Sequence, residues 1–451
     1  MNVPADDDTI CARASAAGRG GITMIRVSGP AATDIARAMT GEVPAPRQAL
    51  LRNFRDADGE PIDTGILLFF PAPHSFTGED VVELQAHGGR MVCEMLLERL
   101  QQLGARPAEP GEFSRRAFLN DKLDLGQAEA IADLIDSESR AAARAAQRSL
   151  SGRFSELVMA LNEQVTQLRV YVEAALDFPE EEVDFLDESE LGQRLGVVGD
   201  AFDSLDASLR QGVLLRDGVH VVLAGRPNAG KSSVLNALAG YEAAIVTEVP
   251  GTTRDLVREQ LDLDGLPLHI IDTAGLREQP DRVEAEGIRR ARSQLATADH
   301  ALLVVDATTP WRDTLAELVA ELPDGLHYTV VVNKIDLTGD RPGSDAELAN
   351  QVFVSARTRD GIDELSEQLK KRVGFDTPGE GTVIARQRHL DALRRAREHF
   401  ETGCRQLKDH RAGELLAADL LEVQNTLAEI TGEFTSDDLL GEIFSSFCIG
   451  K

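Results

Sequence analysis

The sequence has few aromatic residues, few cysteines and few positive charges. Aromatic side chains make up 4% of the 451 residues, which argues against broad surfaces on which nucleic-acid bases stack. The four cysteines form no C-x-x-C pair, as expected of reduced, unpaired thiols. The net charge is −29, and a surface this acidic repels polyanions on average. Any contact with nucleic acid therefore needs a local basic patch or a partner's surface.

Long apolar runs are also missing. No stretch of about twenty apolar residues occurs, so the sequence predicts no membrane-spanning helix. The first eight residues are acidic and lack the charged-then-apolar pattern of a signal peptide. We therefore expect a cytoplasmic protein without a membrane partner. Its length suits about three domains, each large enough for its own core.

The pattern of apolar residues changes along the chain and predicts the domain organisation. Residues 1–119 mix strand and helix signals, as in a compact α+β unit. Residues 120–215 and 379–451 carry apolar stripes at helical spacing, and residues 216–378 alternate strand and helix as a parallel sheet requires. We therefore predict a multidomain α/β protein in which a nucleotide-binding domain is inserted into a helical bundle formed by both flanks.

The strongest motif is GRPNAGKS at residues 225–232. It follows a buried-strand pattern and precedes a helical one, which is the strand, Gly-rich loop and helix order of a P-loop. Backbone N–H groups and the helix N-terminus would face the phosphates. Lys231 would reach the β- and γ-phosphates, and Ser232 would bind Mg²⁺. The residues expected to contact the nucleotide here are Asn228, Ala229, Gly230, Lys231, Ser232 and Ser233.

Three further motifs follow apolar strands and indicate that the nucleotide is GTP. In the first, Asp272 would hold Mg²⁺ through water. In the second, Asp336 would accept two hydrogen bonds from guanine that adenine does not offer, and adenine would leave a buried carboxylate unpaired. In the third, a backbone N–H would hold the guanine carbonyl. The three motifs comprise Asp272, Thr273, Ala274 and Gly275; Asn333, Lys334 and Asp336; and Ser355, Ala356 and Arg357. We therefore predict a Ras-like P-loop GTPase.

The catalytic part departs from the Ras pattern. Ras-type enzymes place a glutamine after the switch glycine to orient the attacking water, but Leu276 stands there. No arginine finger in cis is obvious. Four acids in the following segment are candidates by position, and each could equally be a solvated side chain: Glu278, Asp281, Glu284 and Glu286. The segment 247–255 would lie over the phosphates, where a threonine hydroxyl can complete the Mg²⁺ shell.

The motifs closely resemble those of the MnmE (TrmE) family of tRNA modification GTPases, over essentially the whole chain. Outside the nucleotide domain, the resemblance rests on SFTGED at 75–80, on PGEFS through FLNDKLD at 110–124 and on FCIGK at 447–451. The nucleotide-domain motifs alone would also fit ribosome-assembly GTPases. A regulatory GTPase that binds ribosomal RNA is therefore the alternative.

The resemblance implies how the missing catalytic groups are replaced. Asn228 would bind K⁺ with the backbone carbonyls of Thr247, Val249 and Thr252. Thr253 would join Ser232 on Mg²⁺, and Glu284 would orient the hydrolytic water. The nucleotide domains would pair across a homodimer. The residues placed at the nucleotide by this resemblance are Thr247, Glu248, Val249, Pro250, Gly251, Thr252 and Thr253.

The resemblance also implies a folate site in an N-terminal dimerisation domain. Its positions would be Arg26, Glu83, Lys122 and Lys451, and the ligand would be 5-formyl- or 5,10-methylene-tetrahydrofolate. From the residues alone, Arg26 and Glu83 would be ordinary strand residues. Cys448 would be a free cysteine near the folate site or a functional thiol. It does not fit a prenylation box, because Gly450 and Lys451 follow it.

In that family, GTP hydrolysis drives a conformational cycle in the modification of carbon 5 of the wobble uridine of certain tRNAs. The partner would be an FAD-containing protein of the MnmG type, in a heterotetramer or larger assembly. Two sets of arginines could contact tRNA or could equally pair with nearby acids. They are Arg140, Arg144 and Arg148 on one helical segment, and Arg394, Arg395 and Arg397 on another.

Overall fold

The computed structural model describes residues 8–177, 188–240, 258–272, 298–344, 350–376, 379, 381–433 and 437–450. The chain divides into two compact units. The first contains residues 1–132, 150–190 and 395–451, and the second contains residues 133–149 and 191–394.

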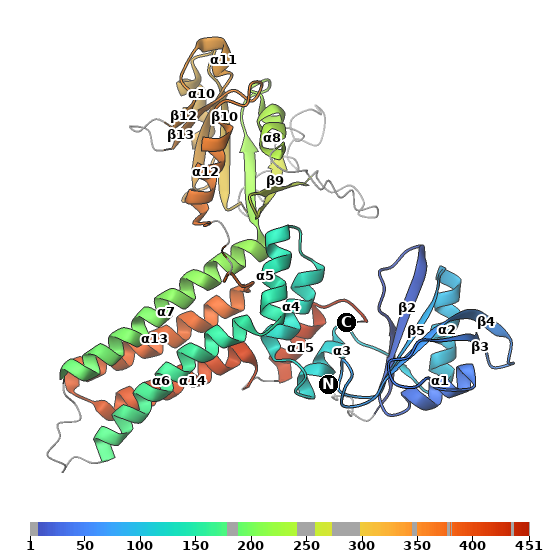
Figure 1. Cartoon of the computed structure of the whole chain (residues 1–451). Coiled ribbons are helices and arrows are strands. Elements are labelled where there is room, and N and C mark those ends of the chain that lie inside the picture. Colours follow the sequence, from blue (N-terminus) through green and yellow to red (C-terminus); the bar gives the residue numbers. More distant parts are fainter. Residues whose placement is uncertain are drawn as a thin grey trace. The chain divides into compact units, whose positions relative to one another are not determined.

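The first unit contains a six-stranded sheet with the order β3-β4-β5-β2-β1-β6 (Figure 1). Its neighbours are antiparallel except for β1 and β6. Two helices cover the sheet and bury a core of aliphatic side chains that includes Ile25, Leu84 and Leu96. The elements are β1 (Ile10–Arg13), β2 (Gly20–Ser28), α1 (Ala32–Thr40), β3 (Leu50–Arg55), β4 (Pro61–Phe70), β5 (Val81–Gly88), α2 (Arg90–Gln102) and β6 (Arg106–Pro107).

Helices complete the first unit. The apolar stripes predicted in the two flanks meet where α6 packs along α14, and Arg169 donates a hydrogen bond to Gln424 between them. Near the C-terminus, Phe444 and Phe447 pack with Leu125 on α4. The elements are α3 (Glu112–Leu119), α4 (Leu125–Ile135), α6 (Arg153–Asp177), α13 (Gln387–His410), α14 (Gly413–Thr431) and α15 (Asp437–Ser445), with α4 and α13 crossing from one unit into the other.

The second unit contains a seven-stranded sheet with the order β12-β13-β11-β10-β7-β9-β8. The five central strands are parallel, as predicted, and the two edge strands are antiparallel to their neighbours. The elements are β7 (Val219–Ala224), α8 (Lys231–Ala239), β8 (Arg258–Leu263), β9 (Leu266–Asp272), β10 (His300–Asp306), α10 (Trp311–Ala320), β11 (Tyr328–Asn333), α11 (Ile335–Thr338), β12 (Gly343–Ser344), β13 (Gln351–Val354) and α12 (Ile362–Val373).

Two flanking helices share the core of this sheet. They are α5 (Arg140–Leu150) and the C-terminal part of α7 (Glu188–Asp217). Ala145 and Ala146 of α5 and Leu215 of α7 are buried in one cluster with side chains of β7, β8 and β9. The fold class predicted from the sequence is confirmed, with an α+β part, a helical part and a P-loop sheet. The boundaries at 119, 215 and 378 stay predictions.

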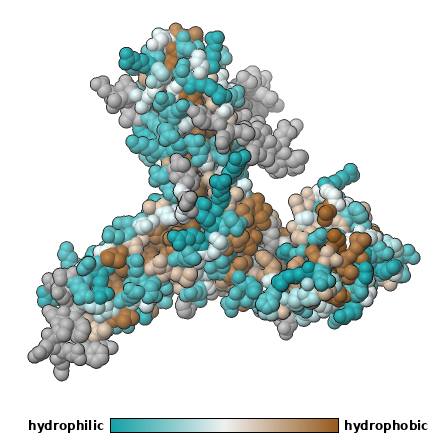
Figure 2. Space-filling model, viewed as in Figure 1, coloured by the Kyte–Doolittle hydropathy of each residue, from teal (hydrophilic) through white to brown (hydrophobic). Residues whose placement is uncertain are grey.

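The described residues include no helix that combines the length and apolar content needed to cross a bilayer. In the space-filling view, apolar residues gather on the part of the surface that belongs to the N-terminal sheet (Figure 2). Three large apolar side chains of the first unit are each more than half exposed: Ile22 on β2, Leu51 on β3 and Met91 on α2.

Candidate nucleotide-binding site

The loop between β7 and α8 has the backbone shape that a phosphate cradle requires. Asn228 lies in the left-handed region with φ 62°, where asparagine is better tolerated than most residues. Gly230 caps α8 with φ 93°. A Cβ atom on Gly230 would lie 2.2 Å from Nδ2 of Asn333, so the close approach requires glycine.

Lys231 turns its side chain back over this loop. Its buried ammonium donates hydrogen bonds to the carbonyls of Gly225 at 3.0 Å and Arg226 at 3.3 Å. The first N–H groups of α8 have no partner within the helix, and the helix dipole favours an anion beside them. The loop, the lysine and the helix end can therefore hold phosphate groups.

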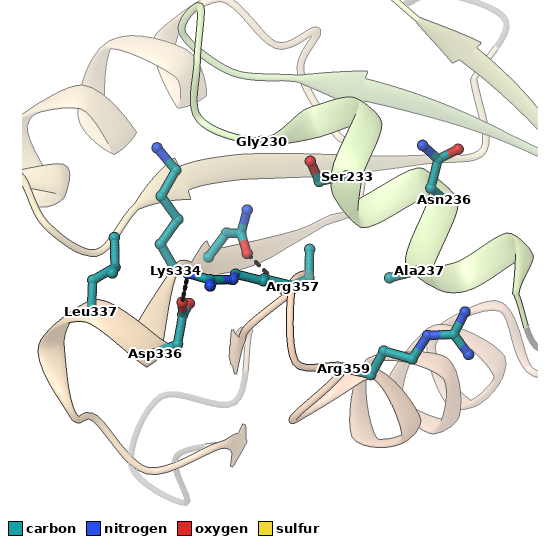
Figure 3. A pocket seen from close by; sticks show the side chains of 11 residues that line it. Gly230, Ser233, Asn236, Ala237, Lys334, Asp336, Leu337, Arg357 and Arg359 are labelled. Atoms are coloured by element: carbon teal, nitrogen blue, oxygen red, sulfur yellow. Dashed lines mark hydrogen bonds and ion pairs between the residues drawn. The ribbon is translucent and has the colours of Figure 1, made fainter.

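A pocket of about 560 Å³ opens beside the loop (Figure 3). Side chains of α8 form one side, and the segments that follow β11 and β13 form the other. All of these elements belong to the second unit. The lining residues are Gly230, Ser233, Asn236, Ala237, Asn333, Lys334, Asp336, Leu337, Ala356, Arg357 and Arg359.

Asp336 presents its carboxylate to this pocket. The hydroxyl of Ser355 donates to one oxygen at 2.8 Å, and a guanidinium nitrogen of the exposed Arg357 lies 3.9 Å from the other. Ser355 Oγ also accepts a hydrogen bond from the N–H of Thr358 at 3.2 Å, which fixes the hydroxyl. The carboxylate is thus oriented by its neighbours and still reaches the cavity, as recognition of two N–H donors of a base requires.

Asn333 ties the phosphate loop to the base-binding loops. Its side chain is 2% exposed. The amide nitrogen donates to the carbonyl of Ala229 at 3.0 Å, and the amide oxygen accepts from the N–H of Ala356 at 3.0 Å. The side chain of Asn333 therefore joins the end of β11 to the phosphate loop and to the loop after β13. It fixes these three segments relative to one another.

The sequence analysis missed four residues that line the pocket, Asn236, Ala237, Leu337 and Arg359. It also missed Asp306, which supports one of the lining residues. Asp306 ends β10 and pairs with the ammonium of Lys334 at 2.6 Å. Burial would raise the pKa of Asp306, but hydrogen bonds from Lys334 and Thr308 lower it below its usual value. The pair holds the Lys334 side chain along the wall of the pocket. The only signal in the sequence was an acid at the end of an apolar strand.

The structure brings together the predicted residues of the P-loop, the NKID segment and the Ser355–Arg357 segment. Their contact with GTP stays a prediction. Asp272 ends β9, and its side chain is not described. The other predicted positions lie outside the described residues: Thr247, Glu248, Val249, Pro250, Gly251, Thr252, Thr253, Thr273, Ala274, Gly275, Glu284 and Lys451.

Two of the predicted folate positions in the first unit, Arg26 and Glu83, form an ion pair with each other. Arg26 and Glu83 face each other across β2 and β5, and two guanidinium nitrogens of Arg26 donate to one Glu83 oxygen at 2.9 and 3.1 Å. The guanidinium lies 5.1 Å from the centre of the Phe76 ring and 5.7 Å from that of Phe113. Aromatic faces beside paired polar groups suit a flat, polar heterocycle.

The remaining N-terminal candidates are more exposed. Lys122 donates to the carbonyl of Pro73 at 3.0 Å. Cys448 is exposed, and the next residue, Ile449, forms a β-bridge with Pro110. All four cysteines are free, as predicted, and burial raises the pKa of Cys11 and Cys404 to about 11. Within the described ranges, no three histidine, cysteine or acidic side chains are grouped as a metal site would require.

Comparisons with known proteins place both parts of the chain in one family. The family model of the MnmE helical domain matches residues 125–448, and the model of the GTP-binding protein TrmE N-terminus matches residues 9–122. The tRNA modification GTPase MnmE of Chromohalobacter salexigens is 55% identical over 449 residues, which cover 98% of both chains. That of Haemophilus influenzae (strain PittEE) is 54% identical over 450 residues, which cover 98% of this chain and 100% of the relative.

Similar solved structures cover less of the chain. An Era variant of Aquifex aeolicus bound to GDP.AlF4⁻ is 28% identical, covers 40% of this chain and 66% of its own, and has a TM-score of 0.27. The G domain of the T. maritima FeoB iron transporter is 28% identical, covers 34% of this chain and 97% of its own, and has a TM-score of 0.26.

Proposed function

The chain belongs to the MnmE family of tRNA modification GTPases, and on this premise we propose that it is a K⁺-activated GTPase that modifies carbon 5 of the wobble uridine of certain tRNAs. Membership makes it a GTP hydrolase that takes part in tRNA modification. The group added would be aminomethyl or carboxymethylaminomethyl. A flavoprotein of the MnmG type would be the partner, with FAD bound to that partner. Likeness over 98% of the chain favours this function over the ribosome-assembly alternative.

The observation that carries the proposal is the pocket at Asp336. Its carboxylate reaches the cavity and is oriented by Ser355. A guanine ring N–H and exocyclic amine would both donate to it, whereas adenine would leave a carboxylate unpaired, at a cost of roughly 1–3 kcal/mol or more. The two hydrogen bonds of the Asn333 side chain hold the phosphate loop at a fixed distance from this carboxylate. The pocket therefore selects a guanine nucleotide and positions its phosphates at Lys231.

Hydrolysis would use residues of the phosphate loop and of two further segments, which we call the switch segments: residues 247–255 and the segment that begins at Asp272. Ser232 and Thr253 would supply hard oxygen ligands of the kind that suits Mg²⁺, and Asp272 would hold the ion through water. Asn228, together with the carbonyls of Thr247, Val249 and Thr252, would hold K⁺, and the left-handed backbone at Asn228 supports a special role for this residue. The bound K⁺ would offset negative charge that develops between the β- and γ-phosphates.

Glu284 would orient the attacking water, because Leu276 has no group for this task. We expect Glu284→Ala to lower the hydrolysis rate on the order of a hundredfold and to leave GTP affinity unchanged. Single-turnover hydrolysis and nucleotide titration separate the two effects. Weaker GTP binding with an unchanged rate would contradict the catalytic role.

The N-terminal domain would bind tetrahydrofolate and form a homodimer. The folate would supply the one-carbon unit. Arg26, Lys122 and Lys451 offer cations for its glutamate or formyl end, and Glu83 offers a carboxylate for pterin N–H groups. Cys448 would lie near this site, as a free or functional thiol. The exposed apolar side chains of the N-terminal sheet support an interface between two copies.

Nucleotide analysis of tRNA tests the proposed function directly. Cells that lack the protein are expected to carry wobble uridine without the carbon-5 group, and the wild-type gene is expected to restore it. Intact modification together with an accumulation of ribosomal precursors would contradict the proposal and favour the ribosome-assembly alternative. The proposed location, the cytoplasm, is where this tRNA pool and the partner would be found.

A further inference from the structure

Helix α5 has an arginine-rich outer face. Its inner face buries Ala142, Ala145 and Ala146, and the last two lie in the core of the nucleotide-binding sheet. On the outer face, Arg140 and Arg144 are exposed, and they follow each other by one helical turn, a rise of about 6 Å. Arg148 is one turn further on and is half-buried, with Nε donating to the carbonyl of Thr382 at 2.5 Å.

These arginines are not matched by acids within the described part of the chain. Neither Arg140 nor Arg144 has a hydrogen bond or ion pair to any described residue. Burial and, secondly, the charge of Arg144 lower the pKa of Arg148, so the two guanidinium groups repel each other. Like charges at this spacing destabilise a helix. The arrangement is therefore unfavourable for the isolated chain.

The arginines of α13 differ in this respect. Arg394 pairs with Asp391 at 3.3 Å, Arg395 with Glu429 at 2.5 Å, and Arg397 with Glu401 at 2.9 Å. Each of these cations is neutralised within the protein. Of the two arginine groups that the sequence offered for RNA contact, the structure thus assigns the α13 group to ordinary solvated ion pairs.

We propose that Arg140 and Arg144 on α5 form a contact surface for the phosphate backbone of tRNA. The inference rests on the tRNA activity of the family. In a chain with a net charge of −29, a polyanion can be held only where cations are locally in excess. The arginine fork binds phosphate oxygens in a bidentate way.

The same face is poorly suited to a protein partner. Besides Arg140 and Arg144 it exposes Gln147 and contains no large apolar side chain. The centre of a protein–protein interface is enriched in aromatic and apolar residues, whereas nucleic-acid interfaces are polar and positively charged. An RNA backbone therefore fits this face better.

The surface lies in the same compact unit as the guanine pocket. Just before α5, Ser139 donates from Oγ to the carbonyl of Gly265 at 3.1 Å, and Gln260 donates to Glu138 at 2.8 Å. Both contacts join the start of α5 to the hairpin of β8 and β9, and β9 ends at Asp272. A tRNA held on α5 is thus anchored to the strand that leads into the predicted switch segment.

The test compares two double variants of the full-length protein, Arg140→Gln/Arg144→Gln and, as the control, Arg394→Gln/Arg397→Gln. Both lose two positive charges, so their net charges are equal. Binding of an unmodified tRNA is measured over a series of salt concentrations. Because the slope of log affinity against log salt reflects the phosphate contacts at about 0.7–0.9 each, the α5 variant is expected to lose about 1.5 units of slope. Its affinity is expected to fall roughly tenfold or more near 0.1 M salt.

The control variant is expected to bind tRNA as the wild type does, and both variants are expected to keep the basal GTPase rate and the thermal stability. An unchanged affinity and slope in the α5 variant would overturn the proposal, as would an equal loss in both variants. If tRNA binding persists but activity with the flavoprotein falls, the surface belongs to a protein partner, and the proposal is wrong. If the α5 proposal is wrong, the proposed function can still hold, because K⁺-dependent hydrolysis and the Glu284→Ala variant test it independently.

Discussion

The guanine pocket and the Arg26–Glu83 pair both place a carboxylate among polar groups, but only one carboxylate is open to a ligand. Among the described residues, Asp336 receives a hydrogen bond of 2.8 Å from Ser355, and a guanidinium nitrogen of Arg357 lies 3.9 Å away. Glu83 receives two hydrogen bonds from one arginine, although its side chain is about as exposed as that of Asp336. The first site therefore offers its charge to the base, while in the second the charges satisfy each other.

This difference indicates how each site would respond to its ligand. A guanine base adds hydrogen bonds to Asp336 without breaking any that Ser355 makes. A folate that uses Glu83 must share that carboxylate with Arg26 or displace it. We therefore expect mutations at Asp336 to act on ligand affinity, and mutations at Glu83 to act on stability as well.

The largest expected effect follows the loss of the open carboxylate. Asp336→Asn replaces an acceptor oxygen with an amide donor that faces the donors of guanine. We expect GTP affinity to fall roughly a thousandfold, with thermal stability close to that of the wild type. Titration with a fluorescent guanine nucleotide measures the affinity. An affinity within a few fold of the wild type would show that another group recognises the base.

A smaller effect, on both stability and folate binding, is expected at the Arg26–Glu83 ion pair. Glu83→Gln leaves the half-buried guanidinium of Arg26 without its carboxylate, and we expect unfolding free energy to fall by about 1–3 kcal/mol. The neutral double variant Arg26→Gln/Glu83→Gln is expected to recover most of this stability but not the binding of tetrahydrofolate. Chemical denaturation and folate titration provide the two readouts. Recovery of both in the double variant would place the folate elsewhere.

The effect that is smallest at neutral pH, and that develops only in acid, concerns the stability of the second unit. His300 is 1% exposed and shares a hydrogen bond of 2.9 Å with the Thr329 hydroxyl. Burial, with the nearby charges of His327 and Arg372, lowers the pKa of His300 from the ordinary histidine value of 6.5 to about 4. The unfolded chain therefore binds an additional proton between these values, and stability falls as the pH decreases from about 6.5 to about 4.

The expected loss from His300 is about 1.4 kcal/mol per pH unit across this window. His300→Gln keeps a donor near Thr329 and does not titrate, so its stability is expected to vary less between pH 6.5 and 4. Denaturant unfolding at several pH values measures the difference. Equal pH slopes in the two proteins would mean that His300 is not neutral in the folded state. Asp8 and Glu112 of the first unit have lowered pKa values and act at lower pH.

The two sites also differ in how far the sequence predicts them. The P-loop and the Asn333–Asp336 segment were predicted because their geometry depends on neighbouring residues, such as the glycine required at position 230. Asp306 was missed, because its pairing with Lys334 depends on two strands being neighbours in the sheet. Arg26 and Glu83 were named only from a family resemblance, because their pairing depends on the register of β2 and β5.

In the helical flanks, too, the sequence predicted the elements but not all of their packing partners. Periodicity predicted the apolar stripes of α6 and α14, and these do pack together. It did not predict that residues 133–149 join the core of the nucleotide-binding sheet. An alanine stripe such as that of α5 can pack closely on a helix or on a sheet, so the stripe alone does not identify its partner.

Hydrolysis of GTP by the purified protein in K⁺ and in Na⁺, at equal ionic strength and with saturating Mg²⁺, tests the central claim most directly. The wild type is expected to hydrolyse GTP many times faster in K⁺, and Asn228→Ala is expected to lose this difference while it still binds GTP. Equal rates of the wild type in the two salts would contradict the claim that an alkali cation supplies the charge that an arginine finger provides in other GTPases.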